Sequence, residues 1–389
     1  MDMTSREAFF LIISLLLLII ISPAAAQSQI LLNDKGSVQI TGDIRSGYIG
    51  FIGKQRNGDH LSQHEFRNRT RIGLDVRLTN QLSFHSRYAV RLSSLDFNLH
   101  PGLNTTSTGN NGLKMGEGAF DQFYASVQMS DWLRLKAGRF QTSFTLDGII
   151  KNSILRQDSP NTDIGWTDGL QLTATTLSGW KTDLIMQSHL LNRPSNVFRY
   201  PLEPDHTHIP FTFFSSIKKG FKAGALSSLS LNVTYSPDML LINSEGHRKS
   251  YIAASIKPQF KKLFNSGRQL LWGTEIAYSF NRPERTVFGF DESPNSSSGG
   301  FGFQTVLSVI DLFKNQHVGL MAAALEPSLL TSSAFWNNLM LFEIRHSTTW
   351  SSNVSTDIRL RYRSDLEKTG GGLNKRRQLY PFARITYKL

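Results

Sequence analysis

The stretch Phe66–Leu78, "FRNRTRIGLDVRL", places arginine at positions 67, 69, 71 and 77, all of them odd. In a helix, at 100° per residue, these arginines and the apolar residues between them would scatter around the axis. In a β-strand they separate, because alternate side chains point to opposite faces. One face then carries Phe66, Ile72, Leu74, Val76 and Leu78, and the other carries the arginines and Asp75. The stretch therefore predicts a strand with one charged face and one largely apolar face.

A strand of this kind fits either a soluble sheet with one solvated face or the wall of a membrane barrel. The same alternation recurs in Leu82–Leu92, Trp272–Asn281 and Val354–Arg363. In each of them the apolar face includes aromatic residues, often near an end of the segment. Repeated period-two segments with such aromatic residues are typical of a barrel with lipid outside and water inside.

Sixteen segments of the chain have strand character, and an even number is expected of an antiparallel barrel. They are 37–49, 64–78, 82–93, 119–129, 132–142, 166–177, 180–190, 209–217, 226–236, 250–260, 269–281, 300–310, 316–325, 335–348, 353–364 and 377–389. The stretches 209–225 and 311–316 are the least regular, so fourteen and eighteen strands are alternatives. Tight connections such as 79–81 alternate with long ones such as 94–118, which is rich in Gly, Asn and Ser. The sequence predicts an all-β fold, a transmembrane antiparallel β-barrel.

The N-terminal segment resembles a signal peptide. Phe9–Ile21 is an apolar run of 13 residues, and Ala24–Ala26 forms a small-residue cleavage site before Gln27. An uncleaved anchor is the alternative, but the run is shorter than the about 20 residues that cross a bilayer. We therefore expect a signal peptide at residues 1–26 and an exported barrel at residues 27–389, with 41 basic and 28 acidic residues and a net charge of +13.

Composition narrows the function classes. The chain has no cysteine, so neither a disulfide framework nor a thiolate zinc site is expected. The positive charge could serve nucleic-acid binding, but an exported chain seldom meets nucleic acid. No serine lies in the Gly-x-Ser-x-Gly motif of esterases. We expect no enzyme activity, catalytic residues, metal site or cofactor.

The chain resembles the Gram-negative outer-membrane porins. The local motif is "GRFQTSF" at 138–144, where Gly138, Arg139 and Thr142 match the end of the fifth strand of general diffusion porins and Ser143 replaces a proline. The same motif is similar to the porin O/P group, some members of which select anions or phosphate. The C-terminal "YPFARITYKL" resembles the family's last strand but ends in Leu389 in place of an aromatic residue.

The resemblance implies an outer-membrane channel with a third loop, here 143–165, that folds into the pore. Its partners would be outer-membrane lipid and small hydrophilic solutes or anions, and its assembly a homotrimer. Loop residues Asp147, Asp158 and Asp163 would face a basic wall and create a transverse field. The pore-lining basic ladder would be Arg67, Arg69, Arg71, Arg77, Arg87, Arg91, Arg359, Arg361 and Arg363.

The charge on inward positions predicts selectivity. With Arg384 and Lys388, the ladder has eleven basic residues, against Asp75, Asp357 and Glu275 on the clearest strands. This excess of eight predicts passive diffusion of small polar solutes with a preference for anions. A porin specific for phosphate or another anion is the alternative, and a barrel without a channel, an enzyme or an adhesin, is a third reading. Individual arginines could instead pair with Asp75, Asp357 or Glu343.

Overall fold

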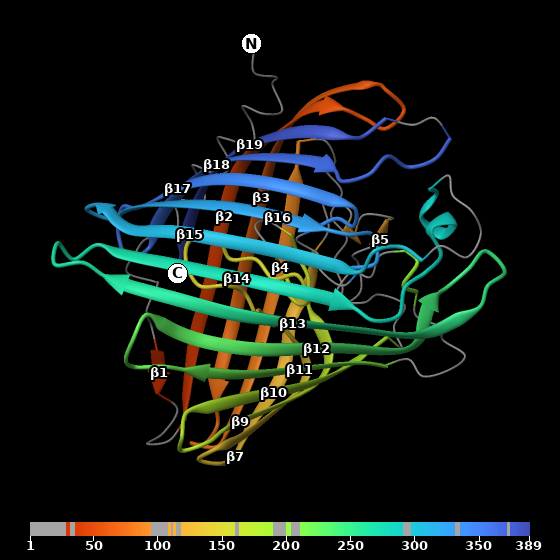
Figure 1. The fold of residues 1–389 in the computed structure, drawn as a ribbon. Helices are drawn as coiled ribbons and strands as arrows, with labels where there is room; N and C mark the ends of the chain where they lie inside the picture. The colour runs from red at the N-terminus through yellow and green to blue at the C-terminus, as the bar shows by residue number, and fades with distance from the viewer. Residues whose placement is uncertain are drawn as a thin grey trace.

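The alternating segments form antiparallel strands that close into a barrel in a computed structural model of the chain (Figure 1). The structure describes residues 29–31, 36–94, 108–109, 112–113, 118–159, 163–189, 200–203, 211–290, 297–330, 335–371 and 374–389. Within these residues, sixteen strands pair in chain order around a ring, and the last of them, β19, pairs with the first, β2. The predicted all-β barrel of sixteen strands is therefore confirmed.

The barrel strands are β2 (Ser37–Lys54), β3 (His60–Arg77), β4 (Leu82–Ser93), β7 (Gly118–Ser130), β8 (Leu133–Phe140), β9 (Thr167–Thr175), β10 (Trp180–Ser188), β11 (Phe211–Gly220), β12 (Leu226–Leu241), β13 (Arg248–Leu263), β14 (Gln269–Ser279), β15 (Phe301–Phe313), β16 (Gln316–Leu325), β17 (Leu339–Thr349), β18 (Val354–Asp365) and β19 (Arg377–Lys388). The shorter elements are β1 (Gln29–Leu31), β5 (Thr108–Gly109), β6 (Gly112–Leu113) and the 3-10 helix η2 (Arg285–Phe288). No helix among the described residues is long and apolar enough to cross a membrane.

The two ends of the barrel differ in the length of their connections. Turns of two to five residues join β3 to β4, β7 to β8 and the following alternate pairs at one end. The connections at the other end include the 26 residues between β8 and β9. In Figure 1 the turns lie toward the left and the bottom, and the longer connections lie toward the right and the top. This asymmetry is typical of outer-membrane barrels, in which the short turns are periplasmic and the long loops extracellular.

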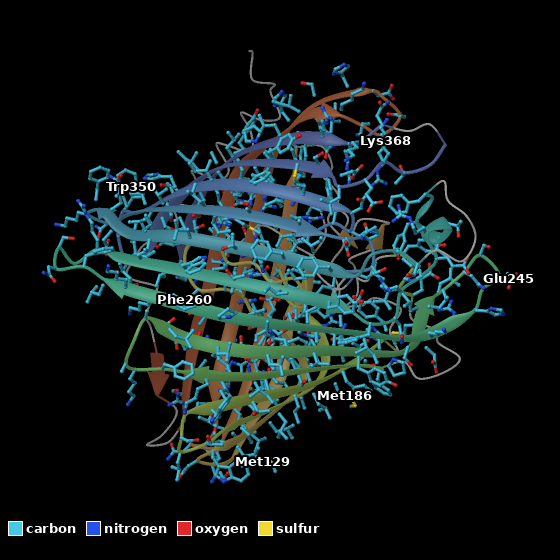
Figure 2. The ribbon with its side chains drawn as sticks, in the orientation of Figure 1. Met129, Met186, Glu245, Phe260, Trp350 and Lys368 are labelled. Carbon is cyan, nitrogen blue, oxygen red and sulfur yellow. The ribbon has the colours of Figure 1, made fainter. Side chains whose placement is uncertain are left out.

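The burial of side chains is reversed relative to a soluble protein. On β3, Arg69 is 0% exposed whereas Ile72 is 61% exposed. On β18, Arg361 is buried and Ile358 is 61% exposed. Figure 2 shows the side chains on the barrel, with Trp350 near the turn end and Lys368 at the long-loop end. Apolar residues outside and charged residues inside require lipid around the barrel and a polar interior.

The closing seam joins the ends of the chain. Asp43 to Lys54 of β2 pair with Lys388 to Arg377 of β19. Beyond the C-terminal end of β19, the same edge of β2 is paired with β1, which binds residues 37–39 and so continues the seam. The backbone N–H of Leu389 also donates to the Gly42 carbonyl at 3.0 Å. Closure leaves no free sheet edge for the hydrocarbon of a membrane to contact.

Some boundaries differ from the sequence-based ones. The expected long connection 50–63 is mostly strand, because residues 49–54 and 60–65 pair one to one and leave a turn at 55–59. Glycines at positions 50, 53 and 58 obscured this pairing in the sequence. Among the described residues, the irregular stretch 209–225 contains the whole of β11, and 311–316 contains the end of β15 and the first residue of β16, so neither stretch adds a strand. The predicted signal peptide, residues 1–26, lies outside the described residues.

Candidate functional site: the barrel interior

The connection between β8 and β9 folds into the barrel interior. Its base is a polar cluster in which the Asp158 carboxylate accepts hydrogen bonds from the Thr142 N–H at 2.8 Å and the Thr167 hydroxyl at 3.0 Å. Arg156 also donates to the Thr142 hydroxyl at 2.9 Å. The Asp158 N–H donates to the Thr142 carbonyl, so the outgoing and returning arms of the loop lie side by side. We call the described part of this connection, residues 141–159 and 163–166, the inner loop.

The tip of the inner loop reaches the opposite wall. Counted around the ring, β16 lies eight strands from β8, which is halfway round. The Ile149 N–H donates to Ser308 of β15 at 3.3 Å, and Arg345 of β17 donates to the Ile149 carbonyl at 3.1 Å. A Cβ built on Gly319 of β16 would lie 2.7 Å from Ile149 Cγ1. The inner loop therefore spans the interior, in agreement with the predicted constricting third loop.

The apolar residues of the inner loop pack against the wall. Leu146, Ile150, Ile154 and Leu155 are buried in one cluster with inward residues of β12 to β17. Apolar side chains inside a water-filled barrel lower the free energy only when they are packed in this way. Their presence in the sequence of a loop is thus explained by contact with the wall.

A continuous set of arginines covers the inward face of β17, β18, β19, β2, β3 and β4. We call it the arginine wall. Its members are Arg45, Arg67, Arg69, Arg71, Arg87, Arg91, Arg345, Arg359, Arg361, Arg363 and Arg384. The carboxylates that form ion pairs with them are Asp43, Glu65, Asp121, Asp163, Glu343 and Asp357. Among the described residues, eleven arginines thus share six carboxylates.

On β2 and β3 the ion pairs form a chain. Asp43 lies 2.9 Å from Arg69 and 3.2 Å from Arg45. Asp121 of β7 lies 2.8 Å from Arg71 and 2.9 Å from Arg87. Asp43 and Asp121 are each shared by at least two guanidinium groups, which reduces the repulsion between stacked arginines without neutralising the wall.

On β18 and β19, arginines alternate with aromatic rings. The Arg359 guanidinium lies 4.3 Å from the centre of the Phe382 ring, and that of Arg363 lies 4.9 Å from the Tyr380 ring. Glu343 of β17 binds Arg345 at 2.7 Å and also binds Arg361. Stacking on an aromatic face holds a guanidinium in place while its charge is retained.

The returning arm of the inner loop touches the arginine wall. The Asp163 carboxylate lies 3.3 Å from Arg91 and 3.7 Å from Arg67, and its carbonyl accepts from Arg69 at 3.2 Å. The loop therefore meets the wall at β3 and β4 through Asp163 and at β17 through Ile149. The part of the wall between these two contacts consists of β18, β19 and β2.

The structure separates the three loop aspartates. Asp163 contacts the arginine wall, whereas Asp158 is buried in the polar cluster at the base of the loop. The Asp147 side chain is exposed, and its N–H donates to Gln259 of β13. Of the predicted ladder, only Arg77 lies outside the wall, exposed at the end of β3.

Sequence reasoning missed several charged residues of the interior. Asp43 and Arg45 follow the period of two on β2, and Glu65 precedes Arg67 on the same face. The alternation in the sequence was therefore sufficient to predict these three residues as inward. Asp121 could not be predicted in this way, because its role depends on β7 lying beside β4. With these carboxylates the surplus of arginines over their partners is five, smaller than the expected excess of eight. Glu275 belongs to another part of the interior, where it pairs with Lys257.

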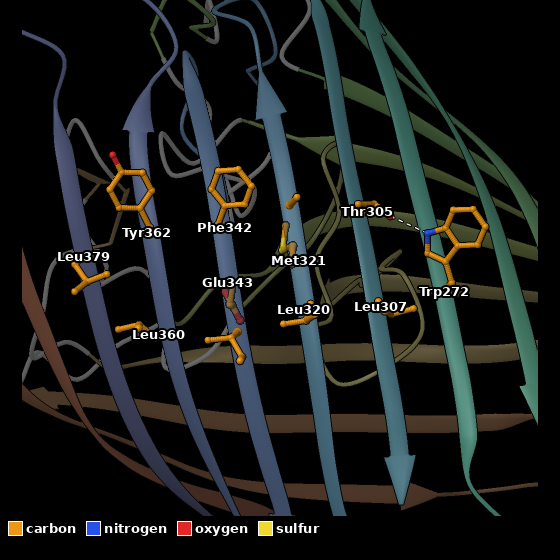
Figure 3. A pocket seen from close by; sticks show the side chains of 12 residues that line it. Trp272, Thr305, Leu307, Leu320, Met321, Phe342, Glu343, Leu360, Tyr362 and Leu379 are labelled. Carbon is orange, nitrogen blue, oxygen red and sulfur yellow. Dashed lines mark hydrogen bonds between the residues drawn. The ribbon is translucent and has the colours of Figure 1, made fainter. Parts of the chain in front are cut away.

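A hollow of the outer surface lies on the side of the sheet opposite to the arginine wall. It has a volume of about 740 Å³ and lies on the lipid-facing side of β14 to β19 (Figure 3). Its lining is apolar, and the Trp272 indole N–H donates to the Thr305 hydroxyl at 2.9 Å within it. No three His, Asp or Glu side chains among the described residues approach one another closely enough to hold a metal ion.

Comparisons with known proteins agree with this architecture. A family model described as Gram-negative porin matches residues 14–202. OprB of Pseudomonas putida has a similar structure, with a TM-score of 0.60 and 12% identity over 90% of this chain and 94% of that one. The channel DcaP of Acinetobacter baumannii has a TM-score of 0.55 and 11% identity, over 93% of this chain and 100% of that one. An anion-selective porin from Comamonas acidovorans has a TM-score of 0.54 and 11% identity, over 91% of this chain and 100% of that one.

No curated protein matches the chain in sequence. At identities of 9–12%, the structural neighbours show a shared fold and say nothing by themselves about solutes. The family match covers the strands up to β10, including the inner loop and the β2 to β4 part of the arginine wall. Together, the matched segment, the sixteen-strand barrel and its apolar outer surface identify the chain as an integral outer-membrane β-barrel that resembles the Gram-negative porins.

Proposed function

We propose that the barrel is a channel for passive diffusion of small polar solutes and that it prefers anions. The observation that carries the preference is the arginine wall, in which eleven arginines share six carboxylates. Arginine remains protonated at any physiological pH, so the surplus charge is permanent. A charged wall of low dielectric constant concentrates its field in the adjoining water and enriches counter-ions there.

The proposed path runs between the inner loop and β18, β19 and β2. The loop contacts the wall on either side of these strands, through Asp163 and Ile149, and so encloses this section. Lys151 and Asp147 on the loop are exposed and would face the same water. Opposed charges across a narrow opening orient water and discriminate between solutes by charge and dipole.

A channel specific for phosphate or another anion is the second candidate. The observation that favours it is the alternation of arginines with Phe382 and Tyr380, which holds the guanidinium groups of Arg359 and Arg363 in defined positions. A general diffusion pore requires only net charge, whereas a binding site requires fixed donors. The Comamonas acidovorans porin of similar fold is anion-selective, which supports an anion preference without choosing between the two candidates.

Two further parts of the proposal concern export, which the N-terminal apolar run suggests, and assembly, which the family resemblance suggests. We infer that residues 1–26 are removed as a signal peptide during export and that residues 27–389 form the mature barrel. We also infer a homotrimer. N-terminal sequencing of the membrane-inserted protein and cross-linking of unheated membranes test these two points separately.

The experiment that tests the function is a reversal-potential measurement. Purified protein is inserted into a planar bilayer separating two concentrations of KCl. An anion-preferring channel gives a reversal potential of the sign expected for chloride, and the opposite sign rejects the anion preference. Saturation of the current by phosphate but not by chloride would favour the specific porin. Absence of any conductance from folded barrels would favour an enzyme or adhesin.

A further inference from the structure

A charged pair lies on the wall beneath the inner loop, away from the arginine wall. Lys257 of β13 and Glu275 of β14 have side chains that are 2% and 0% exposed, and Lys257 Nζ lies 3.1 Å from Glu275 Oε1. A buried ion pair costs desolvation energy, and excellent geometry with further hydrogen bonds is needed to offset it. The other hydrogen-bond partners of Lys257 and Glu275 therefore indicate the role of the pair.

Both residues bind the main chain or a hydroxyl of the inner loop. Lys257 Nζ donates to the Phe144 carbonyl on the outgoing arm and to the Ser153 hydroxyl, at 2.8 Å, on the returning arm. Glu275 Oε2 accepts from the Ile154 N–H at 2.8 Å. The pair therefore binds both arms of the loop at once, and the loop supplies hydrogen bonds that the two charges need.

The wall around the pair is shaped to the loop. Gln259 accepts from the Asp147 N–H, and Gln304 donates to the Asn152 carbonyl at 3.3 Å. Gly319 and Gly273 leave room for loop side chains, since a Cβ on Gly273 would lie 3.2 Å from Leu146 Cδ2 and one on Gly319 would lie 2.7 Å from Ile149 Cγ1. Strands β13 to β16 thus form a docking surface for the loop, with the charged pair near its centre.

We propose that Lys257 and Glu275 are a positioning pair that holds the inner loop on β13 to β16 and thereby sets the width of the pore. The proposal depends on the proposed function in one respect: the barrel must be a channel for the position of the loop to affect conduction. If the loop left the wall, both charges would lose hydrogen-bond partners in a site adapted to a dry contact. Breaking the ion pair is therefore expected to release the loop from the wall.

The test measures release of the loop directly. The chain has no cysteine, so Leu155→Cys, in the packed face of the loop, provides a single reporter. In this background, Lys257→Met leaves Glu275 buried without its counter-charge. Losing one partner of a buried pair is expected to shift the equilibrium toward the released loop by roughly 10²–10³-fold. A membrane-impermeant maleimide should then label the cysteine at least tenfold faster, with higher and noisier single-channel conductance.

Two further variants separate positioning from general loss of stability. Lys257→Met with Glu275→Gln removes both charges, and it should be labelled more slowly than Lys257→Met alone because no lone charge remains buried. Asp365→Asn breaks the ion pairs with Arg56 and Arg376 at the long-loop end, at 2.7 and 3.2 Å, and serves as the control. It should leave labelling unchanged.

The outcome is decided on folded barrels, recognised by their mobility on unheated gels. Equal labelling of the parent and Lys257→Met overturns the proposal. If Lys257→Met does not fold, the neutral double variant decides, and labelling no faster than in the parent overturns the proposal. The labelling rate does not depend on which ions the channel prefers, so the anion preference can fail while the positioning pair stands, and the reverse.

Discussion

Replacing Arg67, Arg69 and Arg71 together by glutamine is expected to weaken the preference for anions. These three residues occupy consecutive inward positions of β3, the strand of the arginine wall that follows β2. Glutamine retains most of the side-chain length and hydrogen-bonding capacity but removes the charge. Glu65, Asp43 and Asp121 would keep their negative charge, and Asp43 and Asp121 would still be paired with Arg45 and Arg87.

The magnitude follows from the charges on the wall. The surplus of arginines over their carboxylate partners falls from five to two. An ion about 8 Å from one wall charge in water has an interaction energy of about 0.5 kcal/mol, which screening over one Debye length reduces to about 0.2 kcal/mol. Three charges give about 0.6 kcal/mol, with opposite sign for an anion and a cation. The ratio of anion to cation permeability should therefore fall roughly sevenfold.

The assay is the reversal potential in a KCl gradient, repeated at several salt concentrations. Two controls accompany it. The same three positions changed to lysine keep the charge and should keep the selectivity. Lys222, Lys261 and Lys262, which are exposed at the turn end, can be changed to glutamine to remove three charges outside the lumen. This second control should change the selectivity little, because salt screens charges that lie outside the lumen from the ions inside it.

Two results would refute the reasoning. An unmodified channel that prefers cations at moderate salt would show that the paired carboxylates, or the loop, dominate the field in the path. A triple glutamine variant that folds and conducts with unchanged selectivity would show that the charges of β3 do not act on the permeating ions. The effect should also diminish at high salt, since it is electrostatic in origin.

Three other predictions follow from the same structure. Deleting residues 148–160 should raise single-channel conductance severalfold in barrels that still fold, and an unchanged conductance would place the loop outside the ion path. Lys151→Cys should react with a hydrophilic maleimide in membranes whereas Leu74→Cys, on the outward face of β3, should be protected by lipid; equal labelling would contradict the assignment of faces. Glu343→Gln leaves Arg345 and Arg361 without their shared counter-charge and should destabilise the barrel by about 3–5 kcal/mol, seen as a lower temperature for loss of the folded gel band; an unchanged temperature would show that the pair contributes nothing to stability.

The strands could be predicted because their signal is local. A period of two, with arginine on one face and apolar residues on the other, is visible within ten residues at Arg67–Arg77 and Arg359–Arg363. The number of strands and the barrel class followed from repetition of that signal. The extension of β2 and β3 beyond it was not predictable, because residues 50–54 are strand through their pairing with 60–64 and, for residues 52–54, with β19.

The ion pairs of the interior could not be predicted from the sequence, because they depend on the register between neighbouring strands. Asp121 binds Arg71 and Arg87 because β7 lies beside β4, and a shift of one residue would turn its side chain to lipid. The separation of Asp158 from Asp163 has a different cause. Thr142 and Thr167, on the two ends of the inner loop, bind Asp158, and this contact exists only once the loop has folded back.

The seam between β19 and β2 also has a kinetic consequence. It pairs residues more than 300 positions apart in the chain, so its loop-closure entropy cannot be recovered until nearly all of the sheet has formed. Until then β2 and β19 expose unpaired edges that can join to other chains. The inner loop, attached after the fifth of the sixteen strands, can cover the apolar inner surface of β13 to β16 before the ring is complete. Docking of the loop would thus give the open sheet the curvature that brings its two edges together, so that the element narrowing the finished pore also assists its closure.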